Sequence, residues 1–160
     1  MYQGDSVNKE FQTSIEDLFY KYGVDIYFSG HVHSYERDYP VYKGVLDPNG
    51  YVNPSATTYL MIGGAGNDEM TNDLKESPNS WSPPVGVGKW IQSSTTGAWT
   101  AATDAGYTGV GKLTVVDDST LTFSYFRSKT GELHDFVTLK RDHSIYIEKF
   151  AATNRETEKE

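Results

Sequence analysis

The 160-residue chain contains no cysteine, so no disulfide stabilises its fold and zinc–thiolate sites are excluded. It also has no run of basic residues, and its formal net charge is −8, whereas binding to a nucleic acid backbone needs clustered Lys and Arg. No stretch approaches the roughly 20 apolar residues of a membrane span, and the N-terminus carries no basic-then-apolar signal pattern. The sequence therefore predicts an acidic globular chain with neither a nucleic acid nor a membrane partner.

Two histidines stand out among the residues that are present. They are His31 and His33, in the segment Gly-His-Val-His-Ser-Tyr-Glu-Arg (residues 30–37), which follows the apolar residues 24–28. In extended backbone, side chains two residues apart point to the same side, with Cβ atoms roughly 7 Å apart. This spacing is wide for one ion but suits two ions about 3.5–4 Å apart, with one imidazole on each. The alternative is a His-x-His pair in an ordinary surface loop.

Residues 8–22 predict one amphipathic helix, because five apolar side chains fall on a single face at the helical period of 3.6. These are Phe11, Ile15, Leu18, Phe19 and Tyr22. Asp5 or Ser6 can cap its start, and Gly23 can end it in the left-handed conformation. A strand at residues 24–29 then presents the histidines at its C-terminal end. This order of helix, strand and site is the α/β arrangement.

After Arg37 the helical period disappears, and the remaining chain is predicted to be mostly β-strands and long loops. A turn at Asp47–Gly50 is expected to join a small hairpin formed by residues 39–42 and 51–52. Residues 57–62 are β-branched and aromatic enough for a buried strand. Three later strands are expected at residues 111–116, 120–126 and 134–139, joined by turns at 117–119 and 129–132.

Residues 63–109 form a long segment rich in Gly, Pro, Ser, Thr and Asn, which predicts irregular structure. Three tryptophans are expected to pin this segment to the core, with ligand stacking as the alternative. They are Trp81, Trp90 and Trp99. Two further histidines, His134 and His143, are expected at the surface.

Residues 30–37 resemble the last metal-binding motif of the purple acid phosphatases, a branch of the calcineurin-like metallophosphoesterases. Residues 58–67 resemble the strand and glycine-rich turn of the same family, and residues 109–115 and 121–126 resemble its closing hairpin. The resemblance covers about residues 1–143. It implies an α/β fold, the C-terminal part of an αββα sandwich, in which one N-terminal helix is followed mostly by β-strands and long loops.

The family's other metal-ligand motifs, which lie upstream of the last one, are absent ahead of His31. Met1 and the tyrosine after it resemble a Met-Tyr pair that follows a His-x-Pro segment in family members. The resemblance therefore implies the C-terminal part of a larger phosphatase, with Met1 internal. Residues 1–50 would end the catalytic domain, residues 51–150 would form the family's C-terminal β-rich region, and residues 151–160 would be a charged, disordered tail.

The resemblance also implies a dinuclear metal centre that joins Fe(III) to Zn, Mn or Fe(II). His31 would hold the divalent ion and His33 the ferric ion, while the backbone of Gly30 and Val32 would line the substrate pocket. Family members hydrolyse phosphate monoesters through a metal-bound hydroxide, and they are mostly secreted, vacuolar or lysosomal. The remaining ligands would come from the missing N-terminal part of the same protein, so the chain alone is expected to be inactive.

Tyr35, Glu36 and Arg37 follow the histidines and allow two interpretations. Ligating imidazoles usually donate their second N–H to a carboxylate or carbonyl, so these residues can help to hold the ligands in place. Alternatively, they form an ordinary ion pair that fixes the loop. Gly63–Gly66 likewise could cradle a phosphate, although a plain strand-to-loop turn is favoured because the Lys-Ser/Thr of a P-loop is absent.

Three functions stay open. The first is the acid phosphatase described above. The second is a related metallophosphoesterase, a nucleotidase or phosphodiesterase, which the Tyr-Glu-Arg continuation disfavours. The third is a non-catalytic β-rich module that binds glycans or proteins through its Tyr- and Trp-rich loops, which would leave residues 30–37 without a role.

Overall fold

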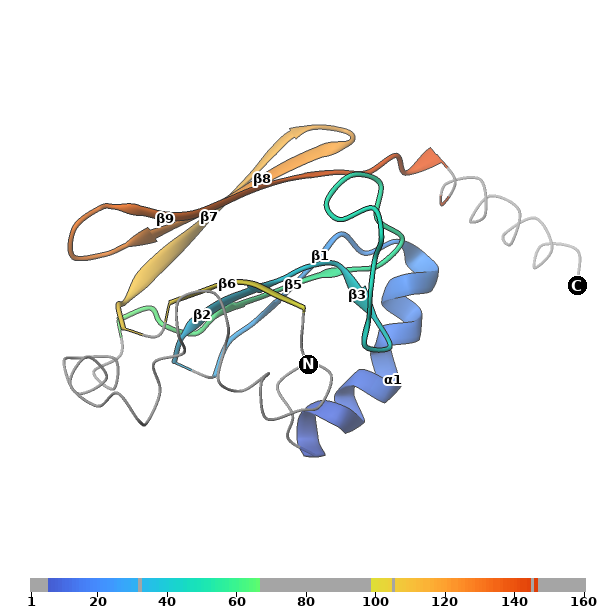
Figure 1. Cartoon of the computed structure of the whole chain (residues 1–160), viewed down its shortest axis with the longest axis horizontal. Coiled ribbons are helices and arrows are strands. Elements are labelled where there is room, and N and C mark those ends of the chain that lie inside the picture. The colour runs from blue at the N-terminus through green and yellow to red at the C-terminus, as the bar shows by residue number, and fades with distance from the viewer. Residues whose placement is uncertain (1–5, 32, 67–98, 105, 145, 147–160) are drawn as a thin grey trace, which may run out of the picture.

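The computed structural model describes residues 6–31, 33–66, 99–104, 106–144 and 146 (Figure 1). The described residues contain one helix, α1 (Ser6–Tyr22), and nine strands. The strands are β1 (Ile26–Ser29), β2 (Tyr35–Asp38), β3 (Val41–Tyr42), β4 (Val45–Leu46), β5 (Thr58–Ile62), β6 (Thr100–Asp104), β7 (Gly109–Asp117), β8 (Thr120–Arg127) and β9 (Leu133–Lys140). One helix followed by many strands confirms the predicted α/β class.

The elements pack in three layers, with a four-stranded sheet in the middle (Figure 1). Its strand order is β1-β5-β2-β6; β1 pairs with β5 in parallel, and the other pairings are antiparallel. α1 covers one face of this central sheet, and the antiparallel sheet β7-β8-β9 covers the other. Successive side chains on a strand face opposite layers. Tyr27 of β1 contacts Phe19 of α1, whereas Phe28 contacts Phe123 of β8.

Two apolar clusters hold the layers together. Val41, Tyr59 and Trp99 are buried on the helix side, where Ile15 and Phe19 pack against them. The cluster between the two sheets has five buried members: Tyr35, Leu60, Phe123, Tyr125 and Val137. The buried position of Trp99 confirms that this tryptophan attaches the chain before β6 to the core.

α1 matches the predicted helix, although the layer beneath it covers only part of its apolar stripe. Ile15 and Phe19 pack on the core, whereas Leu18 and Tyr22 are more than two-fifths exposed. Gly23 ends the helix with a φ of +63°, the left-handed conformation that the sequence predicts there. In the described part of the chain, no helix is both long and apolar enough to cross a bilayer.

The hairpin after β2 lies at a different place from the predicted one. β3 and β4 pair around Lys43 and Gly44, whose φ angles of +50° and +77° make a tight two-residue turn. The backbone N–H of Lys43 donates to the carboxylate of Glu16 in α1 at 2.9 Å, so the helix supports the turn. Lysine is rarely a turn signal, which is why the sequence pattern does not reveal this hairpin.

The turn predicted at Asp47–Gly50 is present, with the N–H of Gly50 donating to the carbonyl of Asp47 at 3.2 Å. The hairpin predicted to flank it, between residues 39–42 and 51–52, is wrong. Val52 pairs instead with Lys140 at the end of β9. Local turn signals cannot indicate a partner so far along the chain.

The segment predicted to be irregular, residues 63–109, contains a strand, so this prediction is wrong in part. β6 pairs antiparallel with β2 and forms one edge of the central sheet. Its Thr-Ala-Ala-Thr-Asp sequence gives a weak strand signal, and the pairing with β2 is what orders it. Residues 67–98, which include Trp81 and Trp90, lie outside the described residues, and so does the predicted tail at 151–160.

The three strands of the outer sheet match the predicted ones and are slightly longer. Leu121, Phe123 and Tyr125 of β8 point toward the central sheet, as their alternation predicts, and the latter two are fully buried. Gly111 of β7 lies against the Phe123 ring, where a Cβ atom would come within 2.6 Å of ring carbon. Glycine at this position therefore leaves room for the Phe123 ring to lie over the backbone of β7.

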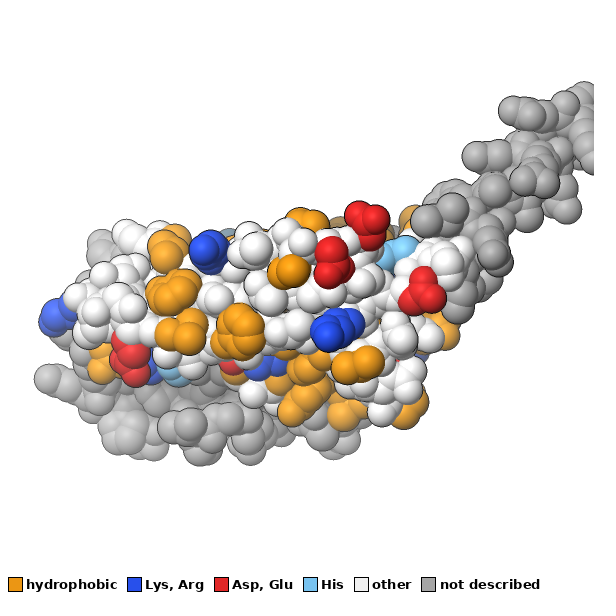
Figure 2. Space-filling model, turned by 90° about the horizontal axis from the view of Figure 1, so that it is seen from above, with side chains coloured by type: hydrophobic (Ala, Val, Ile, Leu, Met, Phe, Trp, Pro, Cys, Tyr) orange, Lys and Arg blue, Asp and Glu red, His pale blue; other side chains and the backbone are white. Residues whose placement is uncertain are grey.

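Apolar side chains on β7 stay exposed on the face that looks toward the central sheet. Leu113 and Val115 lie opposite Phe123 and Leu121 in the strand register, yet they are 43% and 69% exposed. The outer face of the same sheet also carries apolar side chains (Figure 2), among them Val110, Leu133 and Phe136. In addition, β1 is an edge strand of the central sheet as far as the structure describes it.

We expect the purified 160-residue chain to self-associate and to unfold without a sharp transition. The reason is that the open edge of β1 and the exposed apolar side chains of β7 promote association. Thermal unfolding followed by near-UV circular dichroism, together with sedimentation, measures both properties. A sharp cooperative transition from a soluble monomer would contradict this expectation and revive the binding-module interpretation.

Candidate functional site

The two histidines lie in a five-residue loop, residues 30–34, that links β1 to β2. β5 lies between these strands in the sheet, so the loop crosses the C-terminal end of β5. It must span two strand spacings, about 10 Å. The backbone N–H of Gly63, just after β5, donates to the carbonyl of Ser34 at 3.1 Å and ties the loop to the sheet below. Gly63–Gly66 form a turn there, as the favoured interpretation predicts.

The backbone of the loop bends at the first histidine. His31 has a φ of +76°, in the left-handed region, and its side chain is exposed, whereas His33 is half-buried. The expectation of extended backbone through the pair is therefore wrong at His31, and the separation of roughly 7 Å no longer follows from it. A non-glycine residue in this conformation is uncommon and is held there by its surroundings, often at functional sites.

The donor chemistry of the loop fits a transition metal, because imidazole is a good ligand for Zn, Fe and Mn. Among the described residues, however, no group of three or more His, Asp or Glu side chains is arranged to hold an ion. His31 and His33 can thus supply only part of a metal site. Gly30 is open, since a Cβ atom there would meet nothing within 4 Å, and Val32 lies outside the described residues.

Tyr35, Glu36 and Arg37 are all buried in β2, and their side chains alternate between the two faces of the central sheet. Tyr35 and Arg37 point toward the outer sheet and share one carboxylate, Asp135 of β9. Arg37 donates to it from Nε at 2.7 Å and Nη2 at 2.9 Å, and the Tyr35 hydroxyl donates at 2.5 Å. Glu36 faces the other way and accepts from the Thr100 hydroxyl at 2.9 Å.

The protonation states in this cluster follow from burial and from the ion pair. Burial raises the pKa of Asp135, but the hydrogen bonds from Arg37 and Tyr35 outweigh it and leave the pKa below its ordinary value. Burial and the neighbouring Asp135 both raise the pKa of Tyr35, so its phenol stays neutral and donates. The ion-pair interpretation of Arg37 is thereby realised, with a partner that the sequence did not reveal.

Residues 56–136, about half of the chain, match the family described as iron/zinc purple acid phosphatase-like protein C. The chain belongs to the purple acid phosphatase family. It is 35% identical to acid phosphatase A of Cryphonectria parasitica over 83% of this chain and 23% of that protein. It is 32% identical to an Arabidopsis thaliana protein named probable inactive purple acid phosphatase 1, over 81% of this chain and 18% of that protein.

A solved purple acid phosphatase, PPD1 from yellow lupin seeds, has a similar fold, with a TM-score of 0.61 and 28% identity. The likeness covers 83% of this chain and 20% of that one. The chain therefore corresponds to the C-terminal portion of a purple acid phosphatase and spans about a fifth of the length of the relatives it matches. These matches confirm the resemblance that residues 30–37 indicate. The family consists of metallophosphoesterases with a dinuclear metal centre.

The sequence did not indicate Asp135, nor a second ion pair between the buried Asp104 and the half-buried Arg127. Arg127 donates from Nε to the Asp104 carboxylate at 2.6 Å. His134 lies beside this pair, with Nδ1 at 3.8 Å from Asp104 and its ring edge-on to Tyr35. His134 is therefore half-buried rather than a surface residue. The inward register of Asp135, two residues before Val137, is the signal that could have identified it.

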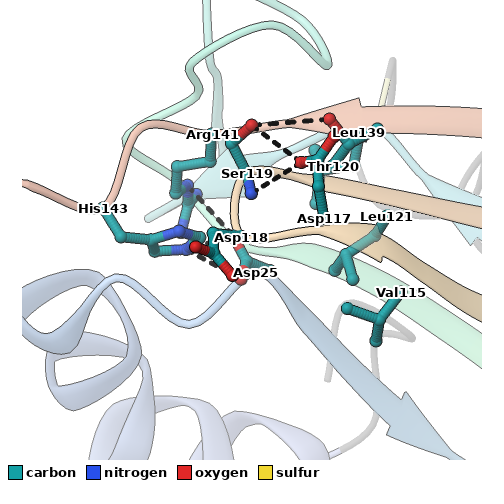
Figure 3. A pocket seen from close by; sticks show the side chains of 10 residues that line it. All are labelled: Asp25, Val115, Asp117, Asp118, Ser119, Thr120, Leu121, Leu139, Arg141 and His143. Carbon is teal, nitrogen blue, oxygen red and sulfur yellow. Dashed lines mark hydrogen bonds and ion pairs between the residues drawn. The ribbon is translucent and has the colours of Figure 1, made fainter.

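A separate pocket of about 230 Å³ lies at the opposite end of β1 from the histidine loop (Figure 3). At this end of β1, Asp25 contacts two residues of the segment that follows β9, Arg141 and His143. His143 Nε2 lies 3.0 Å from one carboxylate oxygen of Asp25, and Arg141 Nε lies 3.4 Å from the other. His143 was expected at the surface, but its contact with Asp25 leaves it half-buried.

Glu36 and Asp38 form a buried acidic pair on the helix-side face of the central sheet. Burial raises the pKa of both carboxyls, and repulsion from Glu36 raises that of Asp38 further. Among the described residues, Asp38 Oδ1 has no hydrogen-bond partner. The raised pKa values favour the protonated carboxyls in the folded state, so the free energy of unfolding depends on pH.

Asp38→Asn in the full-length protein is expected to raise the free energy of unfolding at pH 7 by about 1–2 kcal/mol. Because the folded-state pKa of Asp38 is raised, the wild-type protein has its full stability below the unfolded-state pKa of this carboxyl. It loses stability as the pH rises through the folded-state pKa. Asparagine cannot ionise, so the gain should vanish at about pH 3. Urea denaturation at both pH values measures it, with Asp118→Asn in the exposed β7–β8 turn as the control. An equal gain at both pH values would contradict the charge argument.

Proposed function

We propose that the chain forms the C-terminal part of a dinuclear-metal acid phosphatase that hydrolyses phosphate monoesters. The observation that carries this proposal is the loop between β1 and β2, which sets two imidazoles at the carboxyl end of the parallel pair β1–β5. Open α/β sheets bind their ligands outside this edge. A relative named acid phosphatase supports the reaction class.

In this proposal each histidine serves one ion. His31 binds the divalent ion, which is Zn, Mn or Fe(II), and His33 binds Fe(III). When bound, the ions supply an activated water and clamp the phosphate oxygens. The imidazoles therefore act as ligands and not as general acids, and the backbone of Gly30 and Val32 lines the pocket that receives the phosphate. Tyr35, Glu36 and Arg37 belong to β2, the strand that follows the loop, and their side-chain contacts fix the position of this strand.

The remaining metal ligands are proposed to come from a part of the protein upstream of this chain. Two features of the described residues support such a part: the open edge of β1 and the exposed Leu113 and Val115 of β7, which additional strands would cover. Residues 1–50 would then complete the catalytic domain, with residues 51–150 as the β-rich region and residues 151–160 as the tail. β1 and β5, one from each side of residue 50, pair directly.

The proposed cellular location is outside the cell or in a vacuole or lysosome, as for the family. The proposed partners are a phosphate monoester substrate and the upstream part of the same protein. Nucleic acid and membrane are not among the proposed partners, since the chain is acidic and carries no clustered basic residues.

In the full-length protein, His31→Ala and His33→Ala are each expected to abolish hydrolysis of p-nitrophenyl phosphate and to lower the metal content. The reason is that each imidazole holds a different ion, so His33→Ala alone should also remove the visible absorbance of the ferric centre. Elemental analysis and absorption spectra measure both effects. His143→Ala, at the opposite end of β1, is the matched control and should keep its metal. Wild-type metal content and rate in both loop variants would show that the assignment is wrong.

The purified 160-residue chain is expected to have no phosphatase activity when supplied with zinc and iron salts, because two imidazoles cannot hold two ions against water. Release of p-nitrophenol under these conditions measures it, with the full-length protein as the reference. Robust metal-dependent turnover by the chain would contradict the need for upstream ligands. In the full-length protein, faster turnover of bis-p-nitrophenyl phosphate than of the monoester would favour the phosphodiesterase alternative.

A further inference from the structure

We infer that Asp135 is a positioning residue for the metal-ligand loop, acting through Tyr35 and Arg37 from a different sheet. This inference rests on the proposed function of His31 and His33 as metal ligands. Asp135 lies on β9, far from the loop in sequence, and no motif marks it. Its carboxylate nevertheless receives three hydrogen bonds from the strand that follows the histidines.

The loop is continuous with a strand of the central sheet at each of its two ends, so the positions of these strands determine where it lies. On one side it leaves β1 at Ser29, and on the other it enters β2 at Tyr35, two residues after His33. Between these ends the Gly63 N–H to Ser34 carbonyl bond ties it to the sheet below. His31 has a left-handed conformation in this loop, and such a conformation persists when the surrounding structure holds it in place. The position of β2 relative to β1 therefore sets the separation of the two imidazoles.

β2 is fixed in two directions by its contacts with the outer sheet. The ring of Tyr35 stacks on that of Tyr125 with centroids 3.9 Å apart, which fixes the distance between the layers. The Asp135 carboxylate accepts hydrogen bonds from both Tyr35 and Arg37, the two side chains that β2 points toward the outer sheet. Backbone pairing with β5 and β6 fixes β2 within its own sheet, and this two-point attachment fixes β2 relative to β9 of the outer sheet, which stacking of one ring does less firmly.

The attachment is strong because all its members are withdrawn from water. The side chains of Arg37 and Asp135 are 9% and 10% exposed, and their two parallel N–H···O bonds have the geometry of a bidentate ion pair. Arg37 also donates to the Tyr51 hydroxyl, which in turn donates to the carbonyl of Asp38 at 3.1 Å. Without the carboxylate, Arg37 would be a buried and unpaired cation, and β2 would shift to solvate it.

The test uses the full-length protein, with Asp135→Asn as the variant and zinc as the probe. Removal of the bound metal and titration of Zn²⁺ against a competing chelator gives the affinity of the apoprotein. We expect Asp135→Asn to weaken zinc binding about tenfold or more, a loss of the size seen when residues that orient metal ligands are changed. Val137→Ala, two residues along the same strand and in the same intersheet core, is the control for general destabilisation.

The control decides between positioning and simple stability. If Val137→Ala lowers the melting temperature as much as Asp135→Asn but leaves zinc affinity unchanged, the positioning role stands. If the two variants lose affinity equally at equal loss of melting temperature, Asp135 is merely structural and the inference is overturned. Should Asp135→Asn not fold, Tyr35→Phe removes one of the three bonds and is expected to weaken zinc binding about threefold; unchanged affinity would overturn the inference.

Failure of the proposed function has a different signature. If His31→Ala and His33→Ala leave zinc binding intact, the loop is not a metal site, whatever Asp135 does. If these variants lose zinc but Asp135→Asn and Tyr35→Phe bind it as the wild type does, the metal site stands and the positioning role of Asp135 is wrong.

Discussion

A polar strand buried on both faces is the constraint on which the rest of this structure depends. β2 contains Tyr-Glu-Arg-Asp, and all four residues are buried, although charged side chains are seldom fully buried unless they are paired. Neighbouring elements therefore have to supply polar partners for these side chains. The outer sheet provides Asp135 for Arg37, and β6 provides the Thr100 hydroxyl for Glu36. The apolar clusters hold the layers together, and these polar pairings join β2 to β9 across the layers and to β6 within the central sheet.

Much of the fold can be predicted from the sequence because its signals are local. The helical stripe of α1, the apolar run of β5 and the alternation of Leu121, Phe123 and Tyr125 each depend on residues close together in the chain. β6 and the pairing of Val52 with Lys140 escape prediction because distant partners order them. The hairpin at Lys43 escapes it because Glu16 of the helix supports the turn.

The candidate site likewise has a part that can be predicted from the sequence and a part that cannot. His31, His33 and the residues after them form a compact motif, so their identity is visible in the sequence. Their conformation is not, because the loop that contains His31, with its φ of +76°, crosses the end of a strand that comes later in the chain. Asp135, Asp104 and Arg127 lie in unremarkable strands and acquire a role only when two sheets face each other. The sequence thus identifies the candidate metal-binding groups, whereas the buried ion pairs near them emerge only from the packing.

The position of β5 between β1 and β2 also determines the order in which the site can be assembled. During synthesis the histidines emerge well before β5, which must then enter between two strands that precede it in the chain. The loop cannot reach its final span until this insertion is complete, and such non-local pairing is a slow step in folding. The two imidazoles of a nascent chain are therefore expected to reach their final arrangement only after β5 has paired with both strands. Under the proposed function, tight binding of metal by His31 and His33 would follow closure of the central sheet and would not precede it.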